Sequence, residues 1–119
     1  MDGPQISGGE RDGVWAGNKI PAGQVIERAP VVVVPPHQAW ILGRTDLAAY
    51  LEPWTDAGHA ALPLGFAPLY REGEQPNAEF VPKPDELVIE IVATRDIEPE
   101  DEVVVARLGL RRTSVDVKM

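Results

Sequence analysis

Proline and glycine interrupt this chain so often that long helices are disfavoured throughout it. There are 12 prolines and 11 glycines among 119 residues. Proline removes a backbone donor and breaks helix interiors, and both residues favour turns. Short runs rich in Val, Ile and Leu lie between the breaks, at 24–29, 31–34, 86–94 and 103–105. This spacing predicts a mostly β fold of several small sheets with little helix.

Two of these runs carry specific expectations. The run 86–94 alternates apolar and polar residues as a half-buried strand does. Its predicted core-facing side chains are Leu87, Ile89, Ile91 and Ala93. The run 31–34 consists of valines bounded by prolines, which predicts a buried strand. In the last run, Val103 and Val105 are expected to join Ala93 in the core.

The segment 37–50 is the most helical part of the chain, because it combines Ala, Leu and Ile without proline. Thr45 is a candidate N-cap for the residues that follow it, and Pro53 is expected to end the helix. Residues 62–70 are also apolar, but the proline and glycine among them argue against a regular helix.

The length of 119 residues predicts a single domain over 1–119, with flexible ends at 1–10 and 109–119. The absence of cysteine excludes disulfides, thiol nucleophiles and Cys-ligated zinc. His37 and His59 lack metal-ligand spacing, so no metal site is predicted. The chain shows neither a secretory signal nor an apolar stretch that could span a bilayer, which favours a cytoplasmic protein.

The charge of the chain points toward cationic partners. With 19 acidic and 11 basic residues, the net charge is −8. Nucleic acid is not an expected partner, because affinity for phosphate comes from Lys and Arg. The acidity has two explanations: it keeps the chain soluble, or it attracts a basic, Lys-rich partner protein. Among the tryptophans, Trp15 is expected in the core, whereas Trp40 or Trp54 is a candidate interface residue.

Four segments, taken in order, carry a resemblance to a known family. They are 11–16 (RDGVWA), 20–26 (IPAGQVI), 64–78 (LGFAPLYREGEQPNA) and 93–103 (ATRDIEPEDEV). In order and spacing they resemble the SET domain, the fold of protein-lysine methyltransferases. The resemblance runs from about Arg11 to Leu108. It implies that the central segment and the C-terminal strand form a pseudoknot, with S-adenosylmethionine entering on one face and the target lysine on the other.

The resemblance also implies site residues. The positions that correspond to cofactor contacts are Arg11, Gly13, Trp15, Arg71, Glu72, Pro76 and Asn77. The positions that correspond to catalytic groups are Tyr70 and Arg107, the latter standing where the family has its C-terminal tyrosine.

Several of these positions depart from the family pattern. Arg11 stands at the first glycine of the cofactor loop, Arg71 and Glu72 replace an Asn-His pair, and Gly73 replaces a serine. A guanidinium about 4 Å from the cofactor's sulfonium would cost roughly 4 kcal/mol at an effective dielectric near 20. Arg107 is therefore expected to pair with Glu72, in a salt bridge that plugs the cofactor site.

Three functions are consistent with this sequence. The first is a catalytically degenerate SET-like protein that binds no cofactor and acts by binding a protein or by forming a homodimer. The second is a divergent methyltransferase that uses S-adenosylmethionine and acts on a basic protein. The third reuses the pocket for an anionic small ligand, recognised by Arg11, Arg71 or Arg107.

Overall fold

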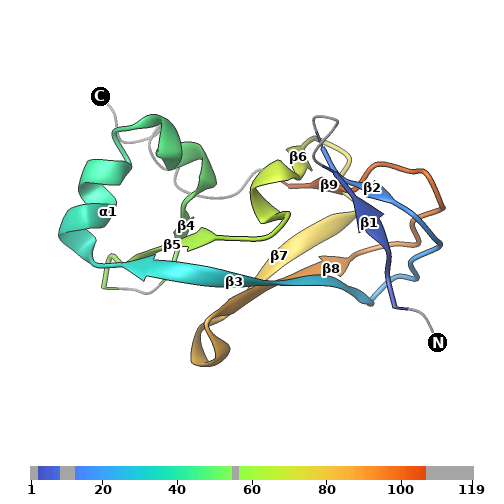
Figure 1. Ribbon diagram of the computed structural model, residues 1–119, viewed down its shortest axis with the longest axis horizontal. Helices are drawn as coiled ribbons and strands as arrows, with labels where there is room; N and C mark the ends of the chain where they lie inside the picture. Colours follow the sequence, from blue (N-terminus) through green and yellow to red (C-terminus); the bar gives the residue numbers. More distant parts are fainter. Residues whose placement is uncertain (1–2, 9–12, 55–56, 107–119) are drawn as a thin grey trace.

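The computed structural model describes residues 3–8, 13–54 and 57–106. Its strands are β1 (Ile6–Ser7), β2 (Trp15–Ala16), β3 (Val25–Val34), β4 (Glu52–Pro53), β5 (Ala60–Pro63), β6 (Arg71–Glu72), β7 (Ala78–Lys83), β8 (Val88–Ala93) and β9 (Val104–Val105). One α-helix, α1 (Pro36–Leu42), and the 3-10 turns η1 (Asp46–Tyr50), η2 (Ala67–Leu69) and η3 (Pro84–Glu86) complete the described elements. The predicted mostly β fold with little helix is confirmed (Figure 1).

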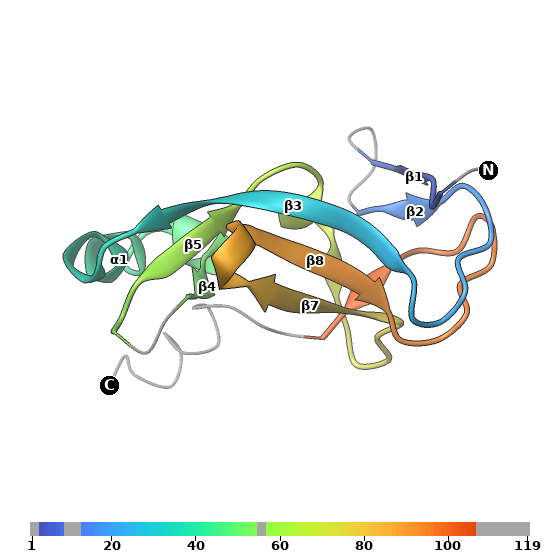
Figure 2. The same cartoon turned by 90° about the horizontal axis from the view of Figure 1, so that it is seen from below.

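The strands form a two-stranded sheet, β1-β2, and a seven-stranded sheet in the order β4-β5-β3-β8-β7-β9-β6. The long strand β3 pairs antiparallel with β8 through its first half and with β5 through its second half. Figure 2 shows that β3 curves along its length, so the larger sheet is curled around the core. Within the described part of the chain, no helix is long and apolar enough to cross a membrane.

The prediction of a separate buried strand over 31–34 is wrong. These valines continue β3 without a break, and Val32 is 47% exposed. Pro30 is tolerated inside β3 because it lies where the strand changes partner from β8 to β5. Its carbonyl still accepts a hydrogen bond from Leu64 N at 2.9 Å, so the missing N–H interrupts the pairing very little.

The predicted core is largely confirmed. Ile89, Ile91 and Ala93 are buried along β8, and Val103 and Val105 are buried beside them. Leu87 was expected in the core, but this residue is 55% exposed. It follows η3 with a left-handed backbone, φ 56°, which turns its side chain away from the inward-facing row of β8.

The expected helix over 37–50 divides into α1 and η1. Thr45 caps η1 as predicted, its Oγ1 accepting a hydrogen bond from Leu47 N at 3.2 Å. Pro53 lies in β4, beyond the end of η1. Of the two candidate interface tryptophans, Trp54 is buried in the core, whereas Trp40 is 67% exposed.

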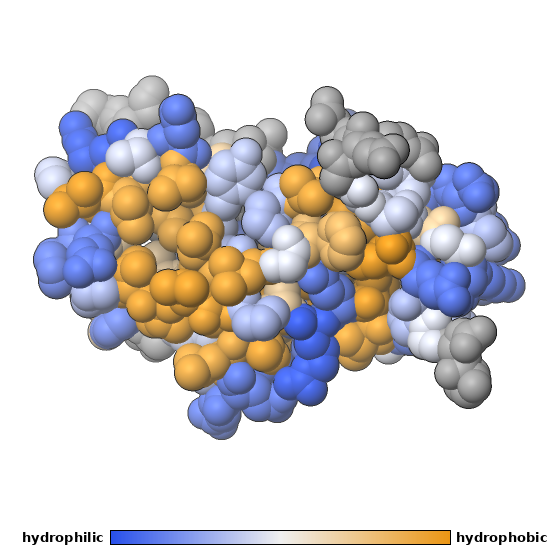
Figure 3. Space-filling view, in the orientation of Figure 1, coloured by the Kyte–Doolittle hydropathy of each residue, from blue (hydrophilic) through white to orange (hydrophobic). Residues whose placement is uncertain are grey.

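Exposed apolar side chains are gathered at one end of the molecule. In Figure 3 the apolar surface is concentrated over the end that carries α1 and β5. The large apolar residues exposed on α1, η1 and the neighbouring strand and turns include Val32, Trp40, Ile41, Leu47, Leu64 and Leu69.

The C-terminal strand is inserted into the segment that precedes it. β9 lies parallel to both β6 and β7, between two strands that only a short loop connects. The loop holds β9 through Gly73 N, which donates to Val105 O at 3.0 Å, and through Asn77 N, which donates to Val104 O at 2.9 Å. This interleaving is the pseudoknot that the sequence predicts.

Candidate functional site

Asn77 fixes the pseudoknot with its side chain. The residue is 8% exposed, and both ends of its amide are bonded to the backbone of the C-terminal segment. Its Nδ2 donates to Glu102 O at 2.9 Å, and its Oδ1 accepts from Val104 N at 2.8 Å. Asparagine is suited to this position because one amide offers a donor and an acceptor together. Asn77 is therefore part of the scaffold on which the neighbouring side chains are arranged.

Glu102 is the centre of a cluster on one side of the pseudoknot. Its Oε1 accepts a hydrogen bond from Arg71 Nε at 2.9 Å. Trp15 pairs with Glu102 through an isolated antiparallel bridge. A Cβ added at Gly13 would meet Glu102 Oε2 and would approach the Trp15 ring at 3.2 Å. We call these four residues the Glu102 cluster.

Gly13 is required at its position for two reasons. Its backbone has φ +144°, a conformation that residues with a side chain rarely adopt. The space beside its Cα is occupied by the side chains of Glu102 and Trp15. The missing Cβ thus makes room for groups of this same chain.

The side chains of adjacent residues in β6 point to opposite sides of the pseudoknot, because side chains alternate along a strand. Arg71 bonds to Glu102 on the first side. Glu72 lines a cavity of about 80 Å³ on the second side. We call this cavity the aromatic pocket. Its walls come from η1, β4, β5, η2, β6, β7 and the end of β9, through Ala49, Tyr50, Glu52, Pro63, Ala67, Pro68, Tyr70, Glu72, Phe80, Val105 and Ala106.

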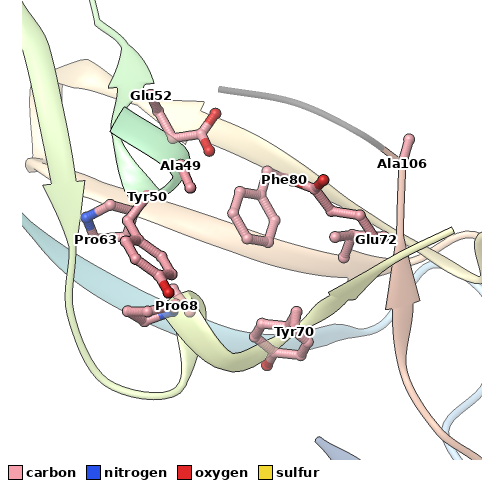
Figure 4. Close-up of a pocket in the computed structure, with 11 residues that line it drawn as sticks. Ala49, Tyr50, Glu52, Pro63, Pro68, Tyr70, Glu72, Phe80 and Ala106 are labelled. Atoms are coloured by element: carbon pink, nitrogen blue, oxygen red, sulfur yellow. The ribbon is translucent and has the colours of Figure 1, made fainter. Parts of the chain in front are cut away.

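Three rings and two carboxylates dominate the aromatic pocket. Figure 4 shows Tyr50, Tyr70 and Phe80 around the same space, with Glu52 above it and Glu72 at its right-hand side. Tyr70 and Phe80 meet edge to face, with ring centroids 6.0 Å apart and planes at 82°. This arrangement is favourable for aromatic pairs and holds the two rings as adjoining walls.

Glu27 holds Tyr70 from the side away from the pocket. Tyr70 OH donates to Glu27 Oε1 at 2.8 Å, and Phe66 N donates to Glu27 Oε2 at 2.9 Å. In Figure 4 the hydroxyl of Tyr70 accordingly points away from the other pocket residues. Burial raises the pKa of Tyr70, and the negative charge of Glu27 and the hydrogen bond raise it further. Tyr70 is therefore a neutral phenol that presents its ring to the pocket.

The structure thus separates the predicted site residues into two groups. Gly13, Trp15 and Arg71 belong to the Glu102 cluster, and Asn77 lies directly beneath it. Tyr70 and Glu72 belong to the aromatic pocket.

Three further predicted positions lie in neither group. Pro76 is half-buried in the loop that encloses β9 and lines neither site. Arg11 and Arg107 lie outside the described residues, so the predicted pair of Arg107 with Glu72 stays a prediction.

Several residues of both sites were not singled out in the sequence. Glu102 had a signal, since it belongs to one of the segments that carry the family resemblance. Glu27 had a weaker one, since it is an acidic residue in a strand next to buried Ile26. Tyr50 and Phe80 had none, because only the curl of the sheet brings their elements to the same cavity. No group of three metal-ligating side chains occurs among residues 3–8, 13–54 and 57–106.

Comparison with known proteins identifies the fold. No protein-family model matches the chain, and no curated protein matches it either. Among solved structures, a candidate histone methyltransferase from Plasmodium falciparum aligns with a TM-score of 0.67 at 23% identity, over 89% of this chain and 93% of that one. The Neurospora SET domain protein DIM-5, a histone lysine methyltransferase, aligns with a TM-score of 0.67 at 16% identity, over 82% of this chain and 48% of that one.

A third match comes from a much longer chain. The Chaetomium thermophilum polycomb repressive complex 2, in an autoinhibited conformation bound to S-adenosylmethionine, aligns with a TM-score of 0.69 at 14% identity. The alignment covers 97% of this chain and 17% of that one. The inserted strand β9, the curled sheet and these structural matches lead to one conclusion. The chain has a SET-like fold.

Proposed function

We propose that this protein is a SET-like binding domain that captures a lysine side chain of a basic partner protein in the aromatic pocket. The observation that carries the proposal is the lining of that pocket, where three rings and two carboxylates surround one cavity. The resemblance places the target lysine of SET domains on the side of the pseudoknot opposite the cofactor, and the aromatic pocket lies opposite the Glu102 cluster.

The chemistry of the lining favours a long side chain with a positive end. Pro63, Pro68 and Ala67 offer apolar walls for methylene groups. The ring faces of Tyr50 and Phe80 attract a cation through their quadrupoles, by roughly 0.5–2 kcal/mol for each well-placed contact. The carboxylates of the lining add Coulomb attraction and accept hydrogen bonds from an ammonium group.

S-adenosylmethionine fits the Glu102 cluster poorly. The space that a glycine-lined cofactor loop would offer beside Gly13 is taken by Glu102 and Trp15. For this reason the proposal is a binding function without methyl transfer. An anionic ligand is not favoured at Arg71 either, because Glu102 already accepts a hydrogen bond from this guanidinium.

Methyl transfer is the second candidate, and one observation favours it. Pairing with Glu102 offsets the positive charge of Arg71, so this arginine would repel a sulfonium less than an unpaired guanidinium. The Glu102 cluster and the aromatic pocket also lie on opposite faces of β6, which is the arrangement that methyl transfer through a narrow channel requires. The structural matches to histone methyltransferases agree with this candidate at the level of the fold.

The test is a titration observed by NMR, with the protein ¹⁵N-labelled. The probe is a decapeptide of alternating Lys and Gly, and the control probe carries norleucine at every Lys. We expect the Lys peptide to cause saturable chemical-shift changes confined to the amides around the aromatic pocket, and the norleucine peptide to cause none. Glu72→Gln should weaken binding about three- to tenfold, which corresponds to roughly 0.7–1.4 kcal/mol.

The matched control variant is Glu79→Gln. Glu79 is exposed on β7, and it does not line the pocket that its neighbour Phe80 lines. It removes the same charge from the same region, so it should change affinity less than twofold. Equal losses in the two variants, or equal binding of the norleucine peptide, would show that the pocket does not recognise the ammonium group.

A further inference from the structure

We infer that the aromatic pocket selects a trimethylated lysine over an unmodified one. The inference rests on the proposed function, because it names the ligand that the same pocket prefers. It is carried by the orientation of the aromatic groups and by the hydrogen bonds of Tyr70, which together determine what kind of cation the pocket can stabilise.

The rings form a partial cage. Tyr50, Tyr70 and Phe80 come from η1, the end of η2 and β7, and they line the cavity from different directions (Figure 4). The interplanar angle of 82° between Tyr70 and Phe80 places the two rings as adjoining walls at nearly a right angle. Cages of this kind bind quaternary ammonium groups through cation–π contacts.

The aromatic walls of the pocket supply few of the hydrogen-bond acceptors that an unmodified ammonium needs. A lysine –NH₃⁺ carries three donors, each of which needs an acceptor when it leaves water. The hydroxyl of Tyr70 is already bonded to Glu27, on the far side of the ring. Phe80 supplies no acceptor. The acceptors among the polar side chains that line the cavity are therefore Tyr50, Glu52 and Glu72.

A trimethylammonium group has no donors to satisfy. Its methyl groups carry the positive charge, and they contact ring faces and the apolar walls directly. It also leaves water at lower cost, because it forms no hydrogen bonds there. The carboxylates of Glu52 and Glu72 keep the site selective for a cation without requiring a hydrogen bond from it.

The size of the cavity agrees with this ligand. One water-sized position takes about 10–15 Å³ of such a volume, so 80 Å³ holds roughly five to eight positions. A trimethylammonium group has four heavy atoms, and the last methylene of the side chain adds a fifth. The volume of the cavity is therefore of the size that the head group needs.

The test compares three peptides that differ at one side chain. Each has a central residue flanked by Gly and Ser: lysine, trimethyllysine, or the neutral carbon isostere in which a tert-butyl group replaces trimethylammonium. Titrations followed by NMR give the three dissociation constants. We expect trimethyllysine to bind at least tenfold more tightly than lysine, and the isostere to bind more weakly than trimethyllysine by a similar factor.

Variants assign the selectivity to the rings. Tyr50→Leu should lower the affinity for trimethyllysine about tenfold and the affinity for lysine by a smaller factor. Tyr50 is 42% exposed, so this variant is expected to fold. Trp40→Leu is the matched control, because Trp40 is an exposed aromatic residue of α1 that does not line the pocket, and its variant should bind as the parent does.

The outcomes separate this inference from the proposed function. Equal affinities for lysine and trimethyllysine would overturn the inference and leave lysine capture standing. Tight binding of the isostere would show an apolar pocket and would overturn both, as would the absence of binding by every peptide. A loss of trimethyllysine binding in Trp40→Leu equal to that in Tyr50→Leu would also overturn the assignment to the cage.

Discussion

Replacing Asn77 by alanine should loosen the pseudoknot more than any other single loss of a side-chain hydrogen bond described above. The substitution leaves Val104 N without its acceptor and Glu102 O without its donor. Val104 is 8% exposed, so water cannot easily take the place of the lost acceptor. An orphaned buried backbone group costs about 1–3 kcal/mol. The two groups together predict a loss of about 2–6 kcal/mol in the free energy of unfolding.

The assay is chemical denaturation of Asn77→Ala beside a matched variant, Asn18→Ala. The side chain of Asn18 also makes two hydrogen bonds to the backbone, accepting from Gln5 N at 3.1 Å and donating to Gly3 O at 3.0 Å. Both of these bonds are exposed to solvent, so water can replace them, and the expected loss is below about 1 kcal/mol. Hydrogen exchange of the Val104 amide should accelerate in Asn77→Ala alone. Similar losses in the two variants would refute the role of burial in this reasoning.

Three further predictions test the sites themselves. In a denaturant titration, Gly13→Ala should lower the free energy of unfolding by about 1–3 kcal/mol more than Gly23→Ala does. Both glycines have positive φ, but of the two only Gly13 has other side chains where its Cβ would lie. The pKa of Tyr70 is raised in the folded state, so above about pH 10 the unfolded state loses this proton first. The free energy of unfolding should therefore fall by up to about 1.4 kcal/mol for each pH unit above that value. Tyr70→Phe should remove this contribution. Calorimetry with S-adenosylmethionine and with its demethylated product should give no dissociation constant tighter than about 1 mM, near −4 kcal/mol, whereas a micromolar value would favour methyl transfer.

The sequence predicts the framework of this protein because short-range patterns, such as capping residues and apolar alternation, determine it. Thr45 precedes η1 as an N-cap, and the alternation of β8 identifies Ile89 and Ile91 as core residues. The Pro-Asn turn that ends at Asn77 belongs to a segment with a recognisable family pattern. Leu87 fails the same reasoning because its left-handed backbone begins the strand one residue later than the apolar pattern does.

The aromatic pocket could not be predicted from the sequence, because its walls and their support come from residues far apart in the chain. Glu27 meets Phe66 and Tyr70 across 39 and 43 residues of chain, and no periodic pattern connects positions that far apart. The pocket exists only when the sheet curls and brings η1, η2 and β7 together. The single advance sign of this contact is a carboxylate in β3 next to buried Ile26, and the sequence alone does not identify its partner.

The two residues of β6 explain how one short strand can support both sites and keep them separate. Arg71 and Glu72 are paired with successive residues of β9, so the register of the pseudoknot fixes both side chains at once. A shift by one residue would exchange their faces, placing a guanidinium in the aromatic pocket and a carboxylate beside Glu102. The second exchange is unfavourable, because two carboxylates would adjoin. The repulsion between them opposes a slip between β6 and β9, and the native register places the carboxylate of Glu72 in the lining of the aromatic pocket.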